Sequence, residues 1–267
     1  MKTIDDIDFN ALYAAHQKAA RYTEIPASHW DAKAERMSRK ANLCNPGYVP
    51  VVLEQIGIAP EETVLDIGCG PGTLSLPLAS ACRHVWALDY SPKMLEVLEG
   101  LANERHLENI TTIRRSWSDD WSDVPEVDVA VSSRATLVGD LDGMLERLNA
   151  KARDRVVITA ITDPHFFDEA IFKAIGRDDK GYPTYIYAVN RLHQMGIECE
   201  VRFITNPPKP FKGTFEELAE SLAFSIGGLT DEEKTRLKAF YDERTAKGIP
   251  IRHGQSRWAM LSWSTRR

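Results

Sequence analysis

Short apolar runs alternate with amphipathic stretches between residues 63 and 161 of this chain. The apolar runs predict strands over Thr63–Gly68, His84–Tyr90, Ile110–Ser116, Val127–Ser133 and Arg155–Ile161. Apolar residues at helical spacing predict helices between them, over Thr73–Ala81, Pro92–Glu104 and Leu141–Lys151. Because strands that alternate with helices form right-handed crossovers, we expect a parallel sheet covered on both faces.

The first 58 residues show no convincing strand pattern. Apolar and aromatic residues recur there at helical spacing in two groups, first Phe9, Leu12, Tyr13 and His16, then Trp30, Ala34, Met37 and Ala41. Pro26 and the Asn45-Pro46-Gly47 cluster interrupt this pattern. We therefore predict two or three helices that form an N-terminal lid over residues 1–58.

The regular alternation of predicted strands and helices ends after Ile161. The segment 163–196 is rich in aromatic and polar residues, and we interpret it as an insertion after the fifth strand that caps a substrate. Further elements are predicted to follow it, a sixth strand over Cys199–Thr205, a helical segment over Phe215–Arg244 and a last strand over Arg257–Ser264. The sequence thus predicts an α/β fold with a doubly wound, seven-stranded, mainly parallel sheet, in a domain over residues 59–267.

The composition excludes some classes of protein. The 267 residues carry 33 Lys and Arg against 39 Asp and Glu, a net charge of −6, which disfavours nucleic acid as a partner. No apolar run approaches the length of about 18 residues needed to cross a membrane, and the start MKTIDDIDFN lacks the basic flank of a signal peptide, so we expect a cytoplasmic protein. The four cysteines form no C-x-x-C pair, and we expect no metal site.

A glycine-rich turn follows the first predicted strand, in the run Val64-Leu65-Asp66-Ile67-Gly68-Cys69-Gly70-Pro71-Gly72-Thr73. Glycines let the backbone approach a ligand closely, and the helix that follows presents unpaired N–H groups. A dinucleotide fingerprint would need a glycine where Thr73 stands, which argues against NAD or FAD. About 20 residues further on, Asp89 ends the second strand, where a carboxylate can bind both ribose hydroxyls. These features indicate a ligand that contains adenosine.

The run Asp66-Ile67-Gly68-Cys69-Gly70-Pro71-Gly72, together with Leu88-Asp89-Tyr90-Ser91-Pro92-Lys93-Met94-Leu95, resembles the class I S-adenosylmethionine-dependent methyltransferases, which have a Rossmann-like fold. The resemblance covers about residues 60–162. It implies an enzyme whose cofactor is S-adenosylmethionine, with the methionine part at the glycine turn and the ribose at Asp89. The residues it assigns to cofactor binding are Trp30, Asp66, Gly68, Cys69, Gly70, Gly72, Asp89, Tyr90, Met94, Ser116, Trp117 and Ser133.

Two of these positions leave alternatives open. Where the family often has an Asp that binds the adenine amino group, this chain has Ser116, so adenine recognition falls to backbone groups, to Asp119 or to packing against Trp117. The Trp30-Asp31 pair is similar to the aromatic-Asp segment that lays a helix over the cofactor, but Trp30 could equally anchor that helix to the core.

No residue is identified as the catalyst, because methyl transfer from a sulfonium is a direct displacement that positioning can accelerate without a dedicated base. The candidates that face the acceptor are Arg134, His165, Tyr185 and His193, with Asp163, Tyr182 and Tyr187 nearby in sequence. Arg134 suits an acidic or phosphorylated acceptor, although a surface ion pair is an equal alternative. Each histidine is more simply a structural residue than a base.

The expected activity is methyl transfer to a small-molecule acceptor. An RNA or protein methyltransferase that uses a local basic surface, such as Arg114, Arg115, Lys209 and Lys212, is an alternative, and a cofactor-binding module without catalysis is another. The run Asn206-Pro207-Pro208 is similar to the signature of amino-directed nucleic-acid methyltransferases, but it follows the sixth strand instead of the fourth, so we interpret it as a turn. The acceptor and the attacking atom are not identified by the sequence.

Overall fold

The computed structural model describes residues 3–41, 47–178, 180–205, 210–252, 254 and 257–266. The Asn206-Pro207-Pro208 turn and Lys209 lie outside the described residues. No helix in these ranges is long and apolar enough to cross a bilayer. Nor do the described His, Cys, Asp and Glu residues gather into a group of three that could hold a metal ion.

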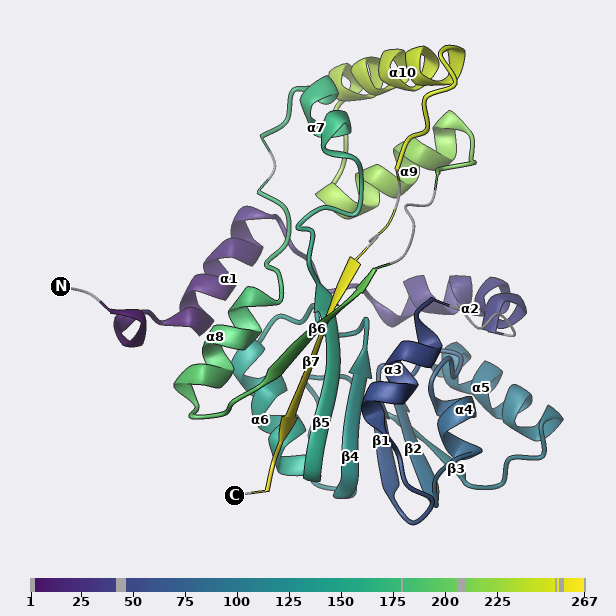
Figure 1. The fold of residues 1–267 in the computed structure, drawn as a ribbon. Helices are drawn as coiled ribbons and strands as arrows, with labels where there is room; N and C mark the ends of the chain where they lie inside the picture. The colour runs from purple at the N-terminus through teal and green to yellow at the C-terminus, as the bar shows by residue number, and fades with distance from the viewer. Residues whose placement is uncertain are drawn as a thin grey trace.

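A seven-stranded sheet in the order β3-β2-β1-β4-β5-β7-β6 forms the centre of the molecule (Figure 1). Its strands are β1 (Thr63–Ile67), β2 (His84–Asp89), β3 (Ile110–Arg114), β4 (Val127–Ser133), β5 (Ala152–Ile161), β6 (Glu200–Thr205) and β7 (Arg257–Ser264). The first five strands are parallel, and β7 runs antiparallel between β5 and β6. The predicted α/β fold with a mainly parallel seven-stranded sheet is confirmed, and β4 and β7 have the predicted bounds.

Helices cover both faces of the sheet because the central strands are apolar on both sides. In β1, Leu65 and Ile67 join one buried cluster while Val64 joins the other. The first cluster includes residues of α1 (Phe9–Ala19), α6 (Leu141–Lys151) and α8 (Ile186–Gln194), and the second includes residues of α3 (Val49–Ile56), α4 (Ser75–Ala79) and α5 (Pro92–Glu104). A further helix, α2 (Ala27–Ala41), packs on α5, and a short 3-10 turn covers Ile4–Asp6. The predicted N-terminal helices are therefore present.

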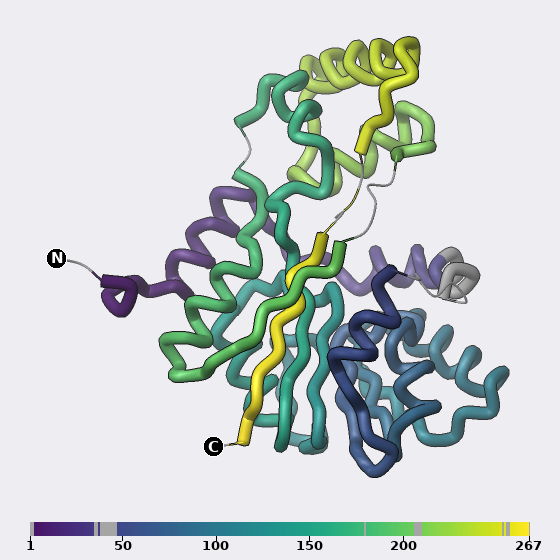
Figure 2. Tube along the Cα trace, viewed as in Figure 1, coloured from purple at the N-terminus to yellow at the C-terminus, as the bar shows by residue number. Residues whose placement is uncertain are grey.

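A second, smaller body of helices stands above the carboxyl ends of the parallel strands (Figures 1 and 2). It contains α7 (Glu169–Ile175), α9 (Phe215–Ile226) and α10 (Asp231–Ala246), and we call it the cap. The cap has its own apolar core, in which Ile171, Leu222 and Leu237 are fully buried. It is thus assembled from two chain segments, one after β5 and one between β6 and β7.

Two features of the cap region differ from the sequence-based expectation. The single helical segment expected over Phe215–Arg244 is two helices, because Gly227 ends α9 in a left-handed conformation and Thr230 starts α10 with a capping box to Glu233. Within the expected insertion 163–196, only α7 belongs to the cap. The second half forms α8, which packs against α1 and α6 on the sheet.

Candidate functional site

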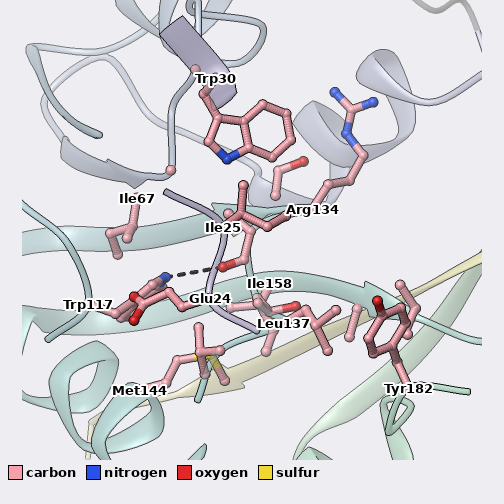
Figure 3. A pocket seen from close by; sticks show the side chains of 18 of the residues that line it. Glu24, Ile25, Trp30, Ile67, Trp117, Arg134, Leu137, Met144, Ile158 and Tyr182 are labelled. Atoms are coloured by element: carbon pink, nitrogen blue, oxygen red, sulfur yellow. Dashed lines mark hydrogen bonds between the residues drawn. The ribbon is translucent and has the colours of Figure 1, made fainter. Parts of the chain in front are cut away.

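A cavity of about 970 Å³ opens at the carboxyl ends of the parallel strands, where open α/β sheets bind their ligands (Figure 3). Its walls come from the turn after β1, the ends of β2 to β5, the segment before α2, and the cap. Pockets for small ligands measure about 300–1,000 Å³. The volume therefore suits a nucleoside-sized molecule together with a small second ligand.

The glycine turn after β1 forms one wall of this cavity. Gly68, Gly70 and Gly72 all have positive φ, at 71°, 53° and 90°. A Cβ on Gly68 would overlap the Cβ of Ala135, whereas a Cβ on Gly70 would meet no atom within 4 Å. The backbone at Gly70 thus leaves open space for a ligand. Gly72 does not line the cavity, since it packs against Leu98 behind the turn.

Two carboxylates lie beside this turn. Asp89, at the end of β2, accepts hydrogen bonds from the backbone N–H of Gly70 and of Ser91, each at 2.9 Å. Asp66 accepts a hydrogen bond of 2.6 Å from the Ser75 hydroxyl. Burial raises the pKa of Asp66 to about 6 and also raises the pKa of Asp89, against the lowering effect of their hydrogen bonds. Asp89 is therefore oriented by the backbone and retains lone pairs directed into the cavity.

The lid contributes Trp30, which lines the cavity from α2 (Figure 3). Its neighbour Asp31 accepts hydrogen bonds from the Ser91 hydroxyl at 2.7 Å and from the Lys93 N–H at 3.3 Å. The Tyr90 hydroxyl donates to the Ile25 carbonyl oxygen at 2.9 Å. Asp31 therefore fastens α2 to the start of α5, and this attachment holds Trp30 over the site.

The segment after β3 closes the opposite end of the cavity. Trp117 lines it, stacks on Trp121 at a ring distance of 5.3 Å, and donates from Nε1 to the Ala135 carbonyl at 3.1 Å. Ser116 also lines the cavity. Asp119 does not, because its carboxylate accepts the Ser116 N–H at 2.7 Å, a bond that lowers the pKa of Asp119. Among the groups considered for adenine, Ser116 and Trp117 are thus the ones at the cavity wall.

Residues after β4 and in the cap complete the wall. Ser133, Arg134 and Tyr185 line the cavity, as do Met94 and Tyr182. The Tyr185 N–H donates to the Ile161 carbonyl at 3.0 Å, so the chain beyond β5 turns back over the strand ends before α8 begins.

Four of the residues considered for the acceptor lie outside this cavity, namely Asp163, His165, Tyr187 and His193. His165 belongs to the cap, where its ring packs on Phe172 at 4.4 Å. His193 sits in the last turn of α8, and Tyr187 of the same helix lies against Tyr13 and bonds to His16 at 2.8 Å. His165 precedes α7 and packs within the cap, and His193 is an exposed residue of α8, so neither ring lines the cavity.

The N-terminal region supplies cavity residues that the sequence did not single out. Tyr13 donates to the Val138 carbonyl at 2.8 Å and Tyr22 donates to the Leu137 carbonyl at 3.0 Å. These bonds join α1 and its carboxyl end to the loop after β4. Thr23, Glu24 and Ile25 are thereby placed in the wall. The helical period of α1 was visible in the sequence, but its docking on a loop more than a hundred residues away was not.

Comparison with known proteins agrees with this geometry. Residues 64–163 match the family model described as a methyltransferase domain. The glycine turn, the strand order and this match together define the class of this domain: residues 64–163 belong to the class I S-adenosylmethionine-dependent methyltransferases. It is an enzyme, and its cofactor is S-adenosylmethionine.

Over 99% of both chains, the protein is 46% identical to an uncharacterized protein of Haemophilus influenzae. A protein of Methanobrevibacter smithii assigned as a cobalt-precorrin-6B C(15)-methyltransferase is 25% identical over 42% of this chain and 60% of its own. Among solved structures, phosphoethanolamine N-methyltransferase 2 of Haemonchus contortus, in complex with S-adenosylhomocysteine, has a TM-score of 0.52 and 17% identity over 82% of this chain and 52% of its own. The last likeness concerns the fold.

Proposed function

We propose that this enzyme transfers the methyl group of S-adenosylmethionine to a small-molecule acceptor enclosed between the sheet and the cap. The observation that carries the proposal is the continuity of the cavity, which runs from the glycine turn and Asp89 to the cap residues Phe166 and Phe224. The wall between these ends contains apolar side chains such as Leu137 and Ile161. An acceptor bound there would be desolvated beside the cofactor, as displacement chemistry favours.

We infer the cofactor contacts from the residues at the turn. The backbone from Gly68 to Gly70 would hold the methionine part, and Asp89 would accept hydrogen bonds from the ribose hydroxyls. Trp30 would cover the bound cofactor, and Trp117 would pack against the adenine. Gly72 would act indirectly, since it allows α5 to pack closely behind the turn.

The proposed reaction is an in-line displacement. S-adenosylmethionine supplies a methyl group on a positively charged sulfur, which leaves as the neutral thioether when the acceptor atom bonds to the methyl carbon. The protein's task is to align the acceptor and exclude water, which can contribute about 7–11 kcal/mol to lowering the barrier. A base is required only when the acceptor atom carries a proton that must leave.

A nucleic-acid acceptor is the main alternative, and the charge around the site gives it little support. Arg115, one of the basic residues considered for RNA, forms an ion pair with Asp123 at 2.5 Å. Asp119 and Asp120 lie four and five residues further along the chain and are exposed. This surface is therefore not a run of uncompensated positive charge of the kind that phosphate backbones require.

The test is incubation of the enzyme and methyl-labelled S-adenosylmethionine with the low-molecular-weight, RNA and protein fractions of a bacterial extract. We expect label in the low-molecular-weight fraction, abolished by excess S-adenosylhomocysteine. Label in RNA alone or in protein alone would replace the proposed acceptor class. Transfer to none of the fractions, by a protein that binds S-adenosylhomocysteine in calorimetry, would favour the non-catalytic module.

A further inference from the structure

Arg134 follows β4 in a backbone conformation that residues other than glycine rarely adopt. Its φ is +60°, a strained conformation that persists only where the surroundings hold it. The Arg134 N–H donates to the Thr159 hydroxyl oxygen at 2.9 Å, and the guanidinium lies 4.8 Å from the centre of the Tyr48 ring. The first contact fixes the backbone of Arg134, and the second places its guanidinium.

Tyr48 is a rigid support for the guanidinium. It precedes α3, is 1% exposed, and its hydroxyl lies 2.7 Å from the hydroxyl oxygens of both Ser133 and Thr159. A ring anchored to two neighbouring strands cannot swing away, and the electron-rich face of such a ring attracts a cation. Arg134 is therefore preset in one orientation before any ligand arrives.

The charge of Arg134 is not balanced by a carboxylate within the part of the chain that the structure describes. Arg155, by contrast, pairs with Glu62 at 2.6 Å, and Arg177 pairs with Glu233 at 2.7 Å. Arg134 nevertheless lines the cavity of a protein with more acidic than basic residues. A guanidinium has five N–H donors in a planar fork that matches the oxygens of a carboxylate or phosphate.

The position of Arg134 assigns it to the second ligand. In the sheet, Asp89 ends β2 on one side of the glycine turn, whereas Arg134 bonds to β5 on the other side. The Tyr48 ring beneath the guanidinium lies 6.3 Å from that of Trp258 on β7. Figure 3 likewise shows Arg134 on the side of the pocket away from Trp117. The cation is thus displaced from the adenosine end toward the acceptor end.

We propose that the methyl acceptor carries an oxyanion, a carboxylate or a phosphate, that Arg134 binds through paired N–H groups. This inference rests on the proposed function. The apolar body of the acceptor would lie against Leu137 and Phe166. Tyr48 and Thr159 are positioning residues: the Tyr48 ring supports the guanidinium, and the Thr159 hydroxyl holds the backbone N–H of Arg134.

The first experiment is calorimetric titration of the protein, saturated with S-adenosylhomocysteine, with benzoate, phenyl phosphate and the neutral amide benzamide. We expect at least one anionic probe to bind about tenfold or more tightly than benzamide, as a charge-assisted hydrogen bond implies. Arg134→Gln should abolish that preference and change the affinity for S-adenosylhomocysteine less than twofold. Arg83→Gln, which alters an exposed arginine outside the cavity, is the matched control and should preserve the preference.

A separate variant tests the positioning role of Tyr48. Tyr48→Phe keeps the ring beneath Arg134 and removes the hydroxyl that bonds to Ser133 and Thr159. It should reduce the preference for the anionic probe severalfold and leave the affinity for S-adenosylhomocysteine unchanged.

Several results would overturn the proposal. Equal binding of benzoate, phenyl phosphate and benzamide to the wild-type protein would do so. A tenfold loss of affinity for S-adenosylhomocysteine in Arg134→Gln would instead assign the arginine to the methionine carboxylate. If none of the probes binds, the extract is passed over an anion exchanger before the methylation assay, and acceptor activity confined to the flow-through refutes the oxyanion. Loss of all binding of S-adenosylhomocysteine by the wild-type protein would contradict the proposed function instead.

Discussion

At the scale of single residues, Asp89 and Asp66 show how one small region gives two carboxylates different environments. Asp89 is 6% exposed and faces the cavity with its oxygens held by backbone N–H groups. Asp66 also lines the cavity but is 2% exposed, and it bonds to the Ser75 hydroxyl at the start of α4. Asp89 is therefore oriented for a ligand, whereas the charged form of Asp66 is destabilised more strongly by desolvation.

Asp89→Asn should weaken the binding of S-adenosylhomocysteine about tenfold or more. The neutral amide replaces a charged acceptor for the ribose hydroxyls, and hydrogen bonds to charged groups contribute about 1.5–3 kcal/mol. Isothermal titration calorimetry measures the change. The control is Asp120→Asn, an exposed carboxylate that does not line the cavity and should leave the affinity as it is. Unchanged binding in Asp89→Asn would show that the ribose lies elsewhere.

Asp66 should make the folded chain less stable as the pH rises. Its pKa is about 6 in the folded chain against an ordinary 3.8, so between these values the folded chain alone holds the proton. Relative to Asp66→Asn, the wild-type protein should lose roughly 3 kcal/mol of unfolding free energy as the pH rises from about 4 through 6.

Urea unfolding at several pH values tests this sign. The contrasting variant is Asp128→Asn, because hydrogen bonds from Thr63 and Arg153 lower the pKa of the Asp128 carboxyl. The ionised Asp128 carboxylate should stabilise the wild-type protein above the ordinary pKa of an Asp. This stabilisation should disappear as the pH falls through the lowered pKa of the folded chain. A flat difference between wild type and Asp66→Asn would contradict the raised pKa.

At the scale of elements, the cap depends on the residues that join its helices. Arg177, just after α7, pairs with Glu233 of α10 and donates to the carbonyl oxygens of Ile226 and Gly228 at 3.0 Å. Both charged side chains of the pair are mostly buried, and the pair lowers the pKa of Glu233 to about 2. One guanidinium thus connects the end of α7 with the turn between α9 and α10.

Arg177→Gln should loosen the cap without unfolding the sheet. Removing Arg177 leaves the mostly buried Glu233 without its cationic partner, and breaking a buried ion pair costs about 3–5 kcal/mol. Hydrogen exchange should accelerate in α7, α9 and α10 and stay unchanged in β1 and β4. The matched control is Lys247→Gln, which removes an exposed pair with Glu243 and should have almost no effect. Equal acceleration in sheet and cap would mean that the two do not open separately.

At the scale of the whole molecule, the lid and the cap meet over the cavity. The His29 ring of α2 stacks on the Phe224 ring of α9 at 4.1 Å with an angle of 5° between the planes. Nearby, Tyr22 and Tyr182 pack edge to face at 6.2 Å. Because Trp30 lies beside His29, the part of α2 that lines the cavity is in direct contact with the cap.

Phe224→Ala should open this contact. The loss of a stacked pair, about 0.5–1.5 kcal/mol, should speed hydrogen exchange severalfold in residues 27–34 and in α9. Phe203→Ala, at an exposed ring on β6, serves as the control and should leave these segments unchanged. If exchange in residues 27–34 does not respond to Phe224→Ala, the lid is held by α5 alone.

The sequence by itself determined the sheet and the class of cofactor, because both follow from patterns of residues that are close together in the sequence. An apolar run marked every strand. Gly68 and Gly70 follow one strand and Asp89 ends the next, and neighbouring parallel strands end at the same edge of a sheet, so these residues lie close together. Tertiary structure alone decided which residues line the cavity. His165 and His193 lie outside the cavity, and the cap joins segments on either side of β6. The contact of Tyr48 with Arg134 depends on how segments far apart in the sequence pack together. The hydrophobic periodicity of a single segment does not specify such packing.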